Sequence, residues 1–206
     1  MGVAKDERSA LCDLFTEVGP DAPTLCTGWL TKDLAAHLVI RERRPDAAAG
    51  ILVTPLAGYT RRVQDSYADR PWPELVDLVR SGPPWYVPGA VDEMINTTEY
   101  FVHHEDVRRG RPGWRPRPPD ERRDSALWAA LSRTGRLLLR NSPVGVVLVR
   151  SDDGREVIAR RGPNTVTISG EPGELLLFAS GRDEVRAEFD GEQSSIARVR
   201  GVSRGL

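Results

Sequence analysis

Three residues of the types that ligate transition metals lie on helix-forming segments of this sequence. Glu99 and His103 are four residues apart, so they share one face of a helix expected from Val91 to about Arg109. His37 lies on the apolar stripe of a second expected helix, which begins near Thr31. If the two helices pack stripe to stripe, the three side chains converge in a bundle core, where helical folds build metal sites. Two histidines and one glutamate suit Zn²⁺ with a fourth position open to water or to a thiolate.

Each of these residues also has an ordinary structural alternative. A histidine on an apolar stripe is often a core residue, and a glutamate four residues before a histidine is often part of a surface ion pair. Glu99, however, lies beside a stripe formed by Ile95, Thr98 and Val102. A buried carboxylate without a cation is costly, so we expect Glu99 to have one. The pattern alone leaves a metal site and an ordinary core both open.

The residues that directly follow His103 are expected at the edge of such a site. His104 points about 100° around the helix from its neighbour, so it cannot share the ligand face and is expected as an outer-shell or rim residue, with Glu105 and Asp106. Asp106 comes three residues after His103. It could hold the second ring nitrogen of that histidine or be a solvated charge, and both interpretations stay open.

The elements that must position these residues change character along the chain. Helical periodicity predicts helices over 5–18, 31–44, 59–69, 73–80, 91–109 and 120–140. After residue 141 the period becomes two, which predicts strands over 144–150, 156–161 and 165–169, a helix over 172–180, a strand over 185–189 and a closing helix over 193–199. The predicted fold class is α+β: a helical bundle over 1–141, followed by a small α/β lobe over 142–206.

Composition excludes several classes of function. The 206 residues include 29 Lys+Arg and 30 Asp+Glu, so the net charge of −1 argues against whole-chain binding to nucleic acid or to anionic membranes. The arginine-rich stretch 108–117 is interrupted by Gly and Pro and has no recognised reader motif. Two cysteines make no disulfide framework, and no apolar stretch is long enough to span a bilayer. We therefore expect a cytoplasmic protein that binds neither nucleic acid nor membrane, as a monomer or a homodimer.

Two stretches carry a resemblance to a known family. Cys26–Trp29 followed by Asp33–Leu38 resembles the metal-binding domain of mycothiol-dependent maleylpyruvate isomerases, a DinB-like four-helix bundle, and Asn96–Asp106 resembles that family's second ligand segment. The whole chain is also similar to an actinobacterial family described as metal-binding, most clearly over Arg41–Asp46, Ser81–Tyr86 and Gly173–Arg182. The resemblance implies a DinB-like antiparallel four-helix bundle before the α/β lobe.

Carried over residue by residue, the resemblance implies His37, Glu99 and His103 as zinc ligands and mycothiol as a cosubstrate. The implied activity is that of a metal-dependent, thiol-dependent transferase or isomerase acting on a small electrophilic or unsaturated acid. In the isomerase chemistry a thiolate adds to a cis double bond conjugated to a carbonyl, the resulting single bond rotates, and elimination gives the trans isomer. The metal lowers the pKa of the thiol. That thiol would belong to the cosubstrate, because Cys12 is expected in the core, while Cys26 is either structural or near the metal.

Further residues are candidates for binding the substrate and the cosubstrate. An anionic substrate needs cationic partners, for which Arg182 and the pair Arg41 and Arg44 are the candidates, although each could be a solvated arginine. Trp29, Trp85 and Tyr86 could line the mouth of the cofactor pocket or pack onto the bundle end. Two other functions remain open: a non-catalytic module that binds a metal or a small ligand, and a metal-dependent hydrolase built on the same bundle.

Overall fold

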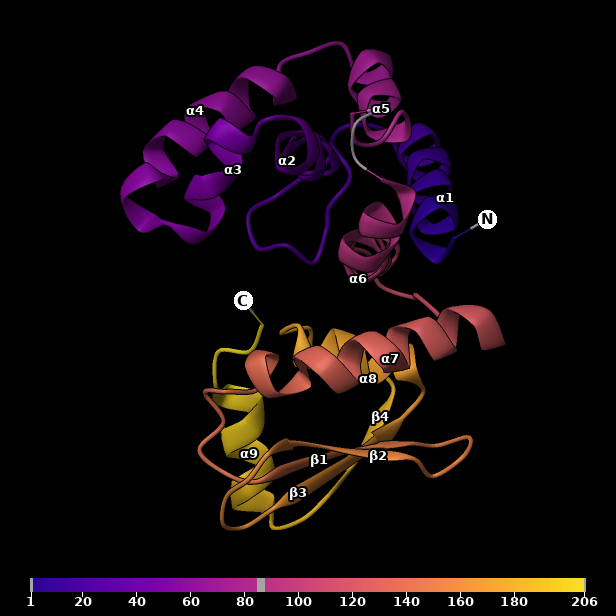
Figure 1. The fold of residues 1–206 in the computed structure, drawn as a ribbon, viewed down its shortest axis with the longest axis vertical. Helices are drawn as coiled ribbons and strands as arrows, with labels where there is room; N and C mark the ends of the chain where they lie inside the picture. The colour runs from indigo at the N-terminus through magenta and orange to yellow at the C-terminus, as the bar shows by residue number, and fades with distance from the viewer. Residues whose placement is uncertain (1, 85–87, 206) are drawn as a thin grey trace. The chain divides into compact units, whose positions relative to one another are not determined.

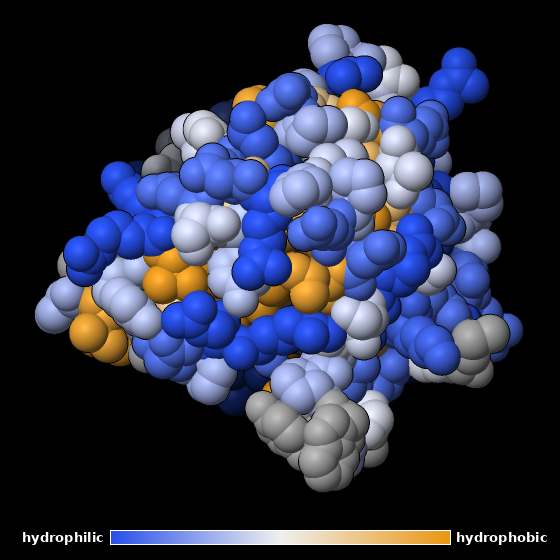
Figure 2. Space-filling model, turned by 90° about the horizontal axis from the view of Figure 1, so that it is seen from above, coloured by the Kyte–Doolittle hydropathy of each residue, from blue (hydrophilic) through white to orange (hydrophobic). Residues whose placement is uncertain are grey.

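A computed structural model describes residues 2–84 and 88–205 of the chain, and it combines helices with one four-stranded sheet (Figure 1). The mixed helix-and-sheet class predicted from the sequence is confirmed. The chain divides into two compact units, Met1–Arg115 and Pro116–Leu206. None of the described helices is long and apolar enough to cross a membrane. The face seen in Figure 2 is mostly hydrophilic, with small apolar areas between the charged side chains.

The described part of the first unit is helical. Its helices are α1 (Val3–Val18), α2 (Thr31–Arg43), α3 (Pro45–Leu52), α4 (Ala57–Ala68), α5 (Trp72–Arg80) and α6 (Gly89–Arg108), with a 3₁₀ turn at Thr54–Leu56. Helix α2 runs through the middle of the unit, with α3 and α4 on one side and α1 and α5 on the other (Figure 1). Helix α6 packs along α1. The two segments that carry the predicted ligands are therefore central elements of this unit.

One apolar core joins the helices that carry these ligands. Leu11 and Phe15 of α1, Leu34 of α2, Leu75 of α5 and Tyr100 of α6 are all fully buried in it. In α1, α2 and α5 the residues of this core recur four positions apart, as Leu11 and Phe15, Leu34 and Leu38, and Leu75 and Val79 do, which explains why these segments form amphipathic helices. The stripe expected on α6 is only partly correct: Val102 is buried, but Ile95 is 50% exposed. Ile95 therefore lies on the solvent side of α6, while Asn96 next to it is buried.

A buried ion network fixes how α1, α2 and α6 meet. Arg8 of α1 contacts Glu42 of α2 and Asp92 of α6, each at 2.8 Å, and its side chain is 7% exposed. Asn96 donates to the same two carboxylates at 2.9 and 2.6 Å. The Arg8 guanidinium also stacks 4.5 Å from the centre of the Tyr100 ring. Burial raises the pKa of Glu42, so this carboxylate depends on Arg8 to stay charged.

The second unit is built on a sheet of strand order β2-β1-β3-β4. Strands β1 (Val146–Arg150) and β2 (Glu156–Arg160) form an antiparallel pair, β3 (Val166–Gly170) runs parallel to β1, and β4 (Ala187–Asp190) is antiparallel to β3. Helices α7 (Glu121–Leu138) and α8 (Pro172–Ala179) lie on one face of this sheet, and α9 (Gln193–Gly201) follows β4 (Figure 1). The predicted strands and helices of this region all form, with ends displaced by up to two residues.

The boundary between the units lies earlier than the sequence suggests. Sequence periodicity groups the segment 120–140 with the helical bundle and divides the chain at 141/142, whereas the units of the structure meet at 115/116. The reason is the packing of α7 against α8 and β2. Gly135 of α7 faces Ala159 and Leu148 of the sheet, and a Cβ placed there would lie 3.7 and 3.9 Å from their methyl carbons. An amphipathic stripe shows that a helix is packed but not which layer it covers.

Replacing Arg8 by leucine tests whether the buried network holds the first unit together. The substitution leaves Glu42 buried without its cation, so we expect Arg8→Leu to lower the free energy of unfolding by about 3–5 kcal/mol. Chemical denaturation of the full chain measures this. The matched control is Arg80→Leu, because Arg80 forms an exposed ion pair with Asp13 and should cost less than about 1 kcal/mol. Equal losses in the two variants would contradict the assignment.

Candidate metal centre

His37, Glu99 and His103 come together in the first unit. Glu99 Oε1 lies 3.4 Å from His37 Nε2 and 3.3 Å from His103 Nε2, and the ligand-type atoms of the three residues all lie within 4.8 Å of one another. His37 comes from the middle of α2, and the other two come from successive turns of α6. The imidazole rings of His37 and His103 meet edge to face at 5.4 Å. The convergence expected from two helix faces is thus what the structure shows.

These separations fit a tetrahedral ion. Ligand atoms bound at about 2.0–2.1 Å to a tetrahedral Zn²⁺ lie about 3.3–3.4 Å from one another. The two distances from Glu99 Oε1 have these values. The donor set of two imidazole nitrogens and one carboxylate oxygen is that of an open zinc site, with one position left for an exogenous ligand. The residues present therefore fit the group that the resemblance implies.

Charge around Glu99 keeps the carboxylate ionised. Burial alone would raise the pKa of Glu99, but the neighbouring His103, His37 and Arg41 hold it well below its usual range. The Nε of Arg41 lies 3.1 Å from Glu99 Oε1, and the guanidinium of Arg41 also donates to Asn96 Oδ1. Arg41 is predicted from the sequence to bind an anionic substrate, and the structure places it against the ligand carboxylate. Its role toward a substrate stays a prediction.

The two histidines are in different electrostatic environments. Burial lowers the pKa of His37, which favours the neutral imidazole that metals bind. For His103 burial acts in the same direction, but Asp106, Cys26 and Glu99 together raise its pKa well above the usual value. The Nδ1 atom of His103 lies 2.9 Å from Asp106 Oδ2, and the Cys26 thiol donates to that same oxygen at 3.2 Å. Of the two alternatives for Asp106, the structure selects the contact with His103.

His104 does not lie at the rim, which corrects the expectation from the sequence. Its side chain is 8% exposed, and its Nδ1 atom lies 2.9 Å from Glu7 Oε2 on α1. Glu105 is also buried and pairs with Arg108 and Arg109. Because α1 covers this side of α6, residues on three sides of the helix are buried here. Helical periodicity shows the direction of a side chain but not how many neighbours surround the helix.

A cavity of about 550 Å³ reaches the cluster through His37. Trp29 lies on its wall, with its ring 5.1 Å from that of His37 and tilted by 49°. The remaining lining comes from the loop before α2, from α2 itself and from α4: Thr27, Gly28, Asp33, Ala57, Thr60, Arg61, Gln64 and Asp65. Trp29 was predicted from the sequence to line the pocket, but the wall formed by α4 was not. The spacing of Arg61 and Asp65, four residues apart, was the available signal.

The other predicted site residues are placed as follows. Trp85 and Tyr86 fall outside the described residues. Arg182 belongs to the second unit, directly after α8, where its guanidinium donates to Ser180 O at 2.6 Å. Its part in binding a substrate stays a prediction. The cysteine predicted to be buried, Cys12, is fully buried and donates to Val76 O.

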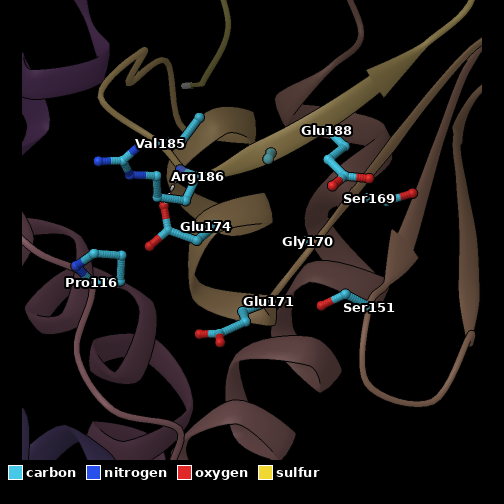
Figure 3. A pocket seen from close by; sticks show the side chains of 10 residues that line it. Pro116, Ser151, Ser169, Gly170, Glu171, Glu174, Val185, Arg186 and Glu188 are labelled. Atoms are coloured by element: carbon cyan, nitrogen blue, oxygen red, sulfur yellow. Dashed lines mark hydrogen bonds between the residues drawn. The ribbon is translucent and has the colours of Figure 1, made fainter.

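The second unit has a cavity of its own, of about 540 Å³ (Figure 3). It lies where the parallel strands β1 and β3 end, and it is lined by Ser151, Gly170, Glu171, Glu174 and Glu188 among others. Within the described part of the chain, these carboxylates do not form a group close enough to share one metal ion. The metal-type clusters of the described residues are His37, Glu99 and His103, and the overlapping set of Cys26, His103 and Asp106.

Comparisons with known proteins identify the fold. No family model and no curated protein matches the sequence. The crystal structure of the mycothiol-dependent maleylpyruvate isomerase matches with a TM-score of 0.61 at 16% identity, over 90% of this chain and 90% of that chain. This chain has the isomerase fold. A histidine-to-alanine mutant of that enzyme matches over the same shares with a TM-score of 0.62 and 17% identity. The resemblance to this isomerase family, inferred from the sequence, is thus confirmed at the level of the fold. A shared fold does not by itself transfer an activity.

Metal content tests the cluster directly. We expect about one equivalent of zinc in purified wild-type protein, and its loss in both His37→Ala and His103→Ala, because each removes one of the three residues predicted to bind the metal. Mass spectrometry of untagged protein measures the content. His104→Ala is the matched control, since His104 contacts Glu7 and should leave the metal in place. Retention of full metal by His37→Ala would show that the ion lies elsewhere.

Proposed function

We propose that this chain is a metal-dependent enzyme that uses a low-molecular-weight thiol to isomerise or transfer a small unsaturated or electrophilic acid. One observation carries the proposal: a three-residue zinc-type ligand set has one of its members, His37, on the wall of a cavity. A metal held only for stability usually has four protein ligands, whereas a catalytic zinc keeps one position open. The arrangement of these residues supports the second kind of site.

The ion proposed here is Zn²⁺, bound by His37, Glu99 and His103. When bound, it would lower the pKa of a coordinated thiol, so that the thiolate is present at neutral pH. The chain's own contribution is to hold the ligands in place and to shape the cavity. Arg41 keeps Glu99 charged and directed toward the histidines. The Trp29 ring packs against the His37 ring on the cavity wall.

The thiol in this proposal comes from a cosubstrate. Burial raises the pKa of Cys12 to about 12, and its Sγ atom donates to a backbone carbonyl in the core. Cys26 directs its thiol toward Asp106, away from the Nε2 atom that faces Glu99. Neither cysteine is among the residues that line the cavity. The fold neighbour is a mycothiol-dependent isomerase, which supports mycothiol as the cosubstrate.

The cavity walls suit a polar cosubstrate and an acid substrate. Asp33, Gln64 and Asp65 offer acceptors for hydroxyl and amine groups, and Arg61 offers a cation for a carboxylate. We propose Arg61, together with the predicted Arg41, for recognition of the acid. The predicted role of Arg182, which belongs to the second unit, is a separate proposal. In the proposed fold assignment, the first unit is the DinB-like metal-binding bundle, and the second unit is the smaller α/β lobe.

The proposed reaction leaves the thiol unchanged overall. The thiolate forms a carbon–sulfur bond to a cis double bond conjugated with a carbonyl, and the electron pair moves onto the carbonyl oxygen. The former double bond becomes a single bond and rotates. Return of the electron pair expels the thiolate and gives the trans acid. A cavity that excludes water protects the electron-rich adduct from side reactions.

Turnover of a cis-unsaturated keto acid tests the proposal. Zinc-loaded protein is mixed with maleylpyruvate and mycothiol, and formation of the trans isomer is followed by absorbance. We expect turnover only with both zinc and thiol. Glu99→Gln should lower the rate by more than the roughly 10- to 100-fold that is typical for loss of a ligand's outer partner. Glu17→Gln is the matched control, because Glu17 is exposed on α1 and should leave the rate unchanged.

Two results would contradict the proposed function. Activity of the zinc-loaded protein that needs no thiol would favour a hydrolase, in which water takes the open position. A protein that binds zinc but shows no turnover with any unsaturated acid and thiol would favour a binding module.

A further inference from the structure

His103 uses both of its ring nitrogens. The Nε2 atom faces Glu99 at 3.3 Å, and the Nδ1 atom contacts Asp106 Oδ2 at 2.9 Å. A metal bound at Nε2 would take the lone pair of that nitrogen, which leaves the ring hydrogen on Nδ1, where the carboxylate of Asp106 can accept it. The Asp106 side chain is 0% exposed, which keeps water from competing for this contact. Carboxylate partners of this kind orient metal-binding histidines in many proteins.

Cys26 contacts the same Asp106 carboxylate that holds His103. Its Sγ atom donates to the same Oδ2 atom of Asp106 at 3.2 Å, so one carboxylate oxygen receives both the thiol and the imidazole. Two donors on one oxygen restrict the rotation of the carboxylate more than one donor does. The loop around Cys26 is itself fixed on α6, because Leu25 N donates to Asp106 O at 3.0 Å. Within the loop, Cys26 N donates to Thr24 Oγ1 at 3.1 Å.

Cys26, His103 and Asp106 could also be read as a second set of metal ligands. Their atoms are separated by 2.9, 3.2 and 3.9 Å. In a tetrahedral zinc site, a sulfur and a nitrogen or oxygen ligand lie about 3.5–3.6 Å apart, given bond lengths near 2.3 and 2.0–2.1 Å. The distance from Cys26 Sγ to Asp106 Oδ2, 3.2 Å, is shorter than this, and the distance from Cys26 Sγ to His103 Nδ1, 3.9 Å, is longer. The shortest separation is an ordinary hydrogen bond, so the set fits a hydrogen-bonded chain better than an ion site.

We propose that Cys26 is a positioning residue of the metal centre: its thiol holds Asp106, and Asp106 holds the Nδ1–H of His103, which directs Nε2 toward the metal. This inference rests on the proposed metal site and adds the residues that set its geometry. It also links the site to its cavity, because the loop that carries Cys26 continues to Thr27, Gly28 and Trp29, which line the cavity. The thiol of Cys26 thus acts through a hydrogen bond and takes no part in the reaction.

Zinc affinity, measured by competition with a chromophoric chelator, tests this inference without any assay of activity. We expect Asp106→Ala to weaken zinc binding by about 10- to 100-fold. Cys26→Ala should weaken it by about fivefold, the contribution of one ordinary hydrogen bond. Cys26→Ser keeps a donor at this position and should recover most of the affinity. Asp106→Asn keeps an acceptor for Nδ1–H and serves as the milder variant if Asp106→Ala does not fold.

A matched control and a spectroscopic readout separate positioning from ligation. Cys12→Ala removes the other thiol, which lies in the core against Val76, and should leave zinc affinity unchanged. Cobalt-substituted protein without added thiol should show no sulfur-to-cobalt charge-transfer band, and Cys26→Ala should change only the ligand-field bands. Loss of a charge-transfer band in Cys26→Ala would show that Cys26 is a ligand, and it would overturn the inference.

The outcomes also separate this inference from the proposed function. Equal zinc affinity in the wild type and in Cys26→Ala, or a Cys26→Ser variant as weak as Cys26→Ala, would overturn the positioning role and leave the zinc site standing. A folded wild type that binds no zinc at all would overturn both.

Discussion

The first unit depends on placing one carboxylate between two imidazoles at the contact of α2 and α6. Glu99 Oε1 lies 3.3–3.4 Å from two histidine nitrogens and 3.1 Å from Arg41 Nε. Such a charge would be costly in this partly buried place without cations around it. The need to compensate it explains why Arg41 points inward from α2, and why three side chains distant in sequence meet at one oxygen. The same compensation makes the site a ready ligand set for a divalent metal.

A second group of buried charged residues holds α2 and α6 in place around Glu99. Arg8 joins α1 to Glu42 of α2 and Asp92 of α6, and Asn96 connects that network to Arg41. On the other side of α6, His104 pairs with Glu7 of α1. The ligand helices are therefore held by polar contacts on two sides and by the apolar core between them. Directional contacts fix the rotation of a helix about its axis more strictly than apolar packing does, and a metal site needs that accuracy.

The sequence predicted the elements and the convergence of His37, Glu99 and His103 well, because both depend on local spacing, while the role of these residues as metal ligands stays a proposal. Glu99 and His103 share a face at any helix packing, and the apolar stripe around His37 required that side chain to point inward. What sequence reasoning could not supply were contacts between distant segments. His104 was expected at the rim, but it is covered by α1, whose Glu7 is 97 residues away. Ile95 was expected inside and is half exposed. The wall of α4 was missed, because the four-residue spacing of Arg61 and Asp65 shows that they share a helix face but not what that face borders.

The central claim is an open metal centre at which an external thiol binds. X-ray absorption at the zinc edge tests it most directly, on zinc-loaded protein with and without mycothiol. We expect nitrogen and oxygen neighbours alone at about 2.0–2.1 Å in the absence of thiol, and one sulfur neighbour at about 2.3 Å after mycothiol is added. A sulfur neighbour already present without mycothiol, or an unchanged spectrum after its addition, would contradict the account.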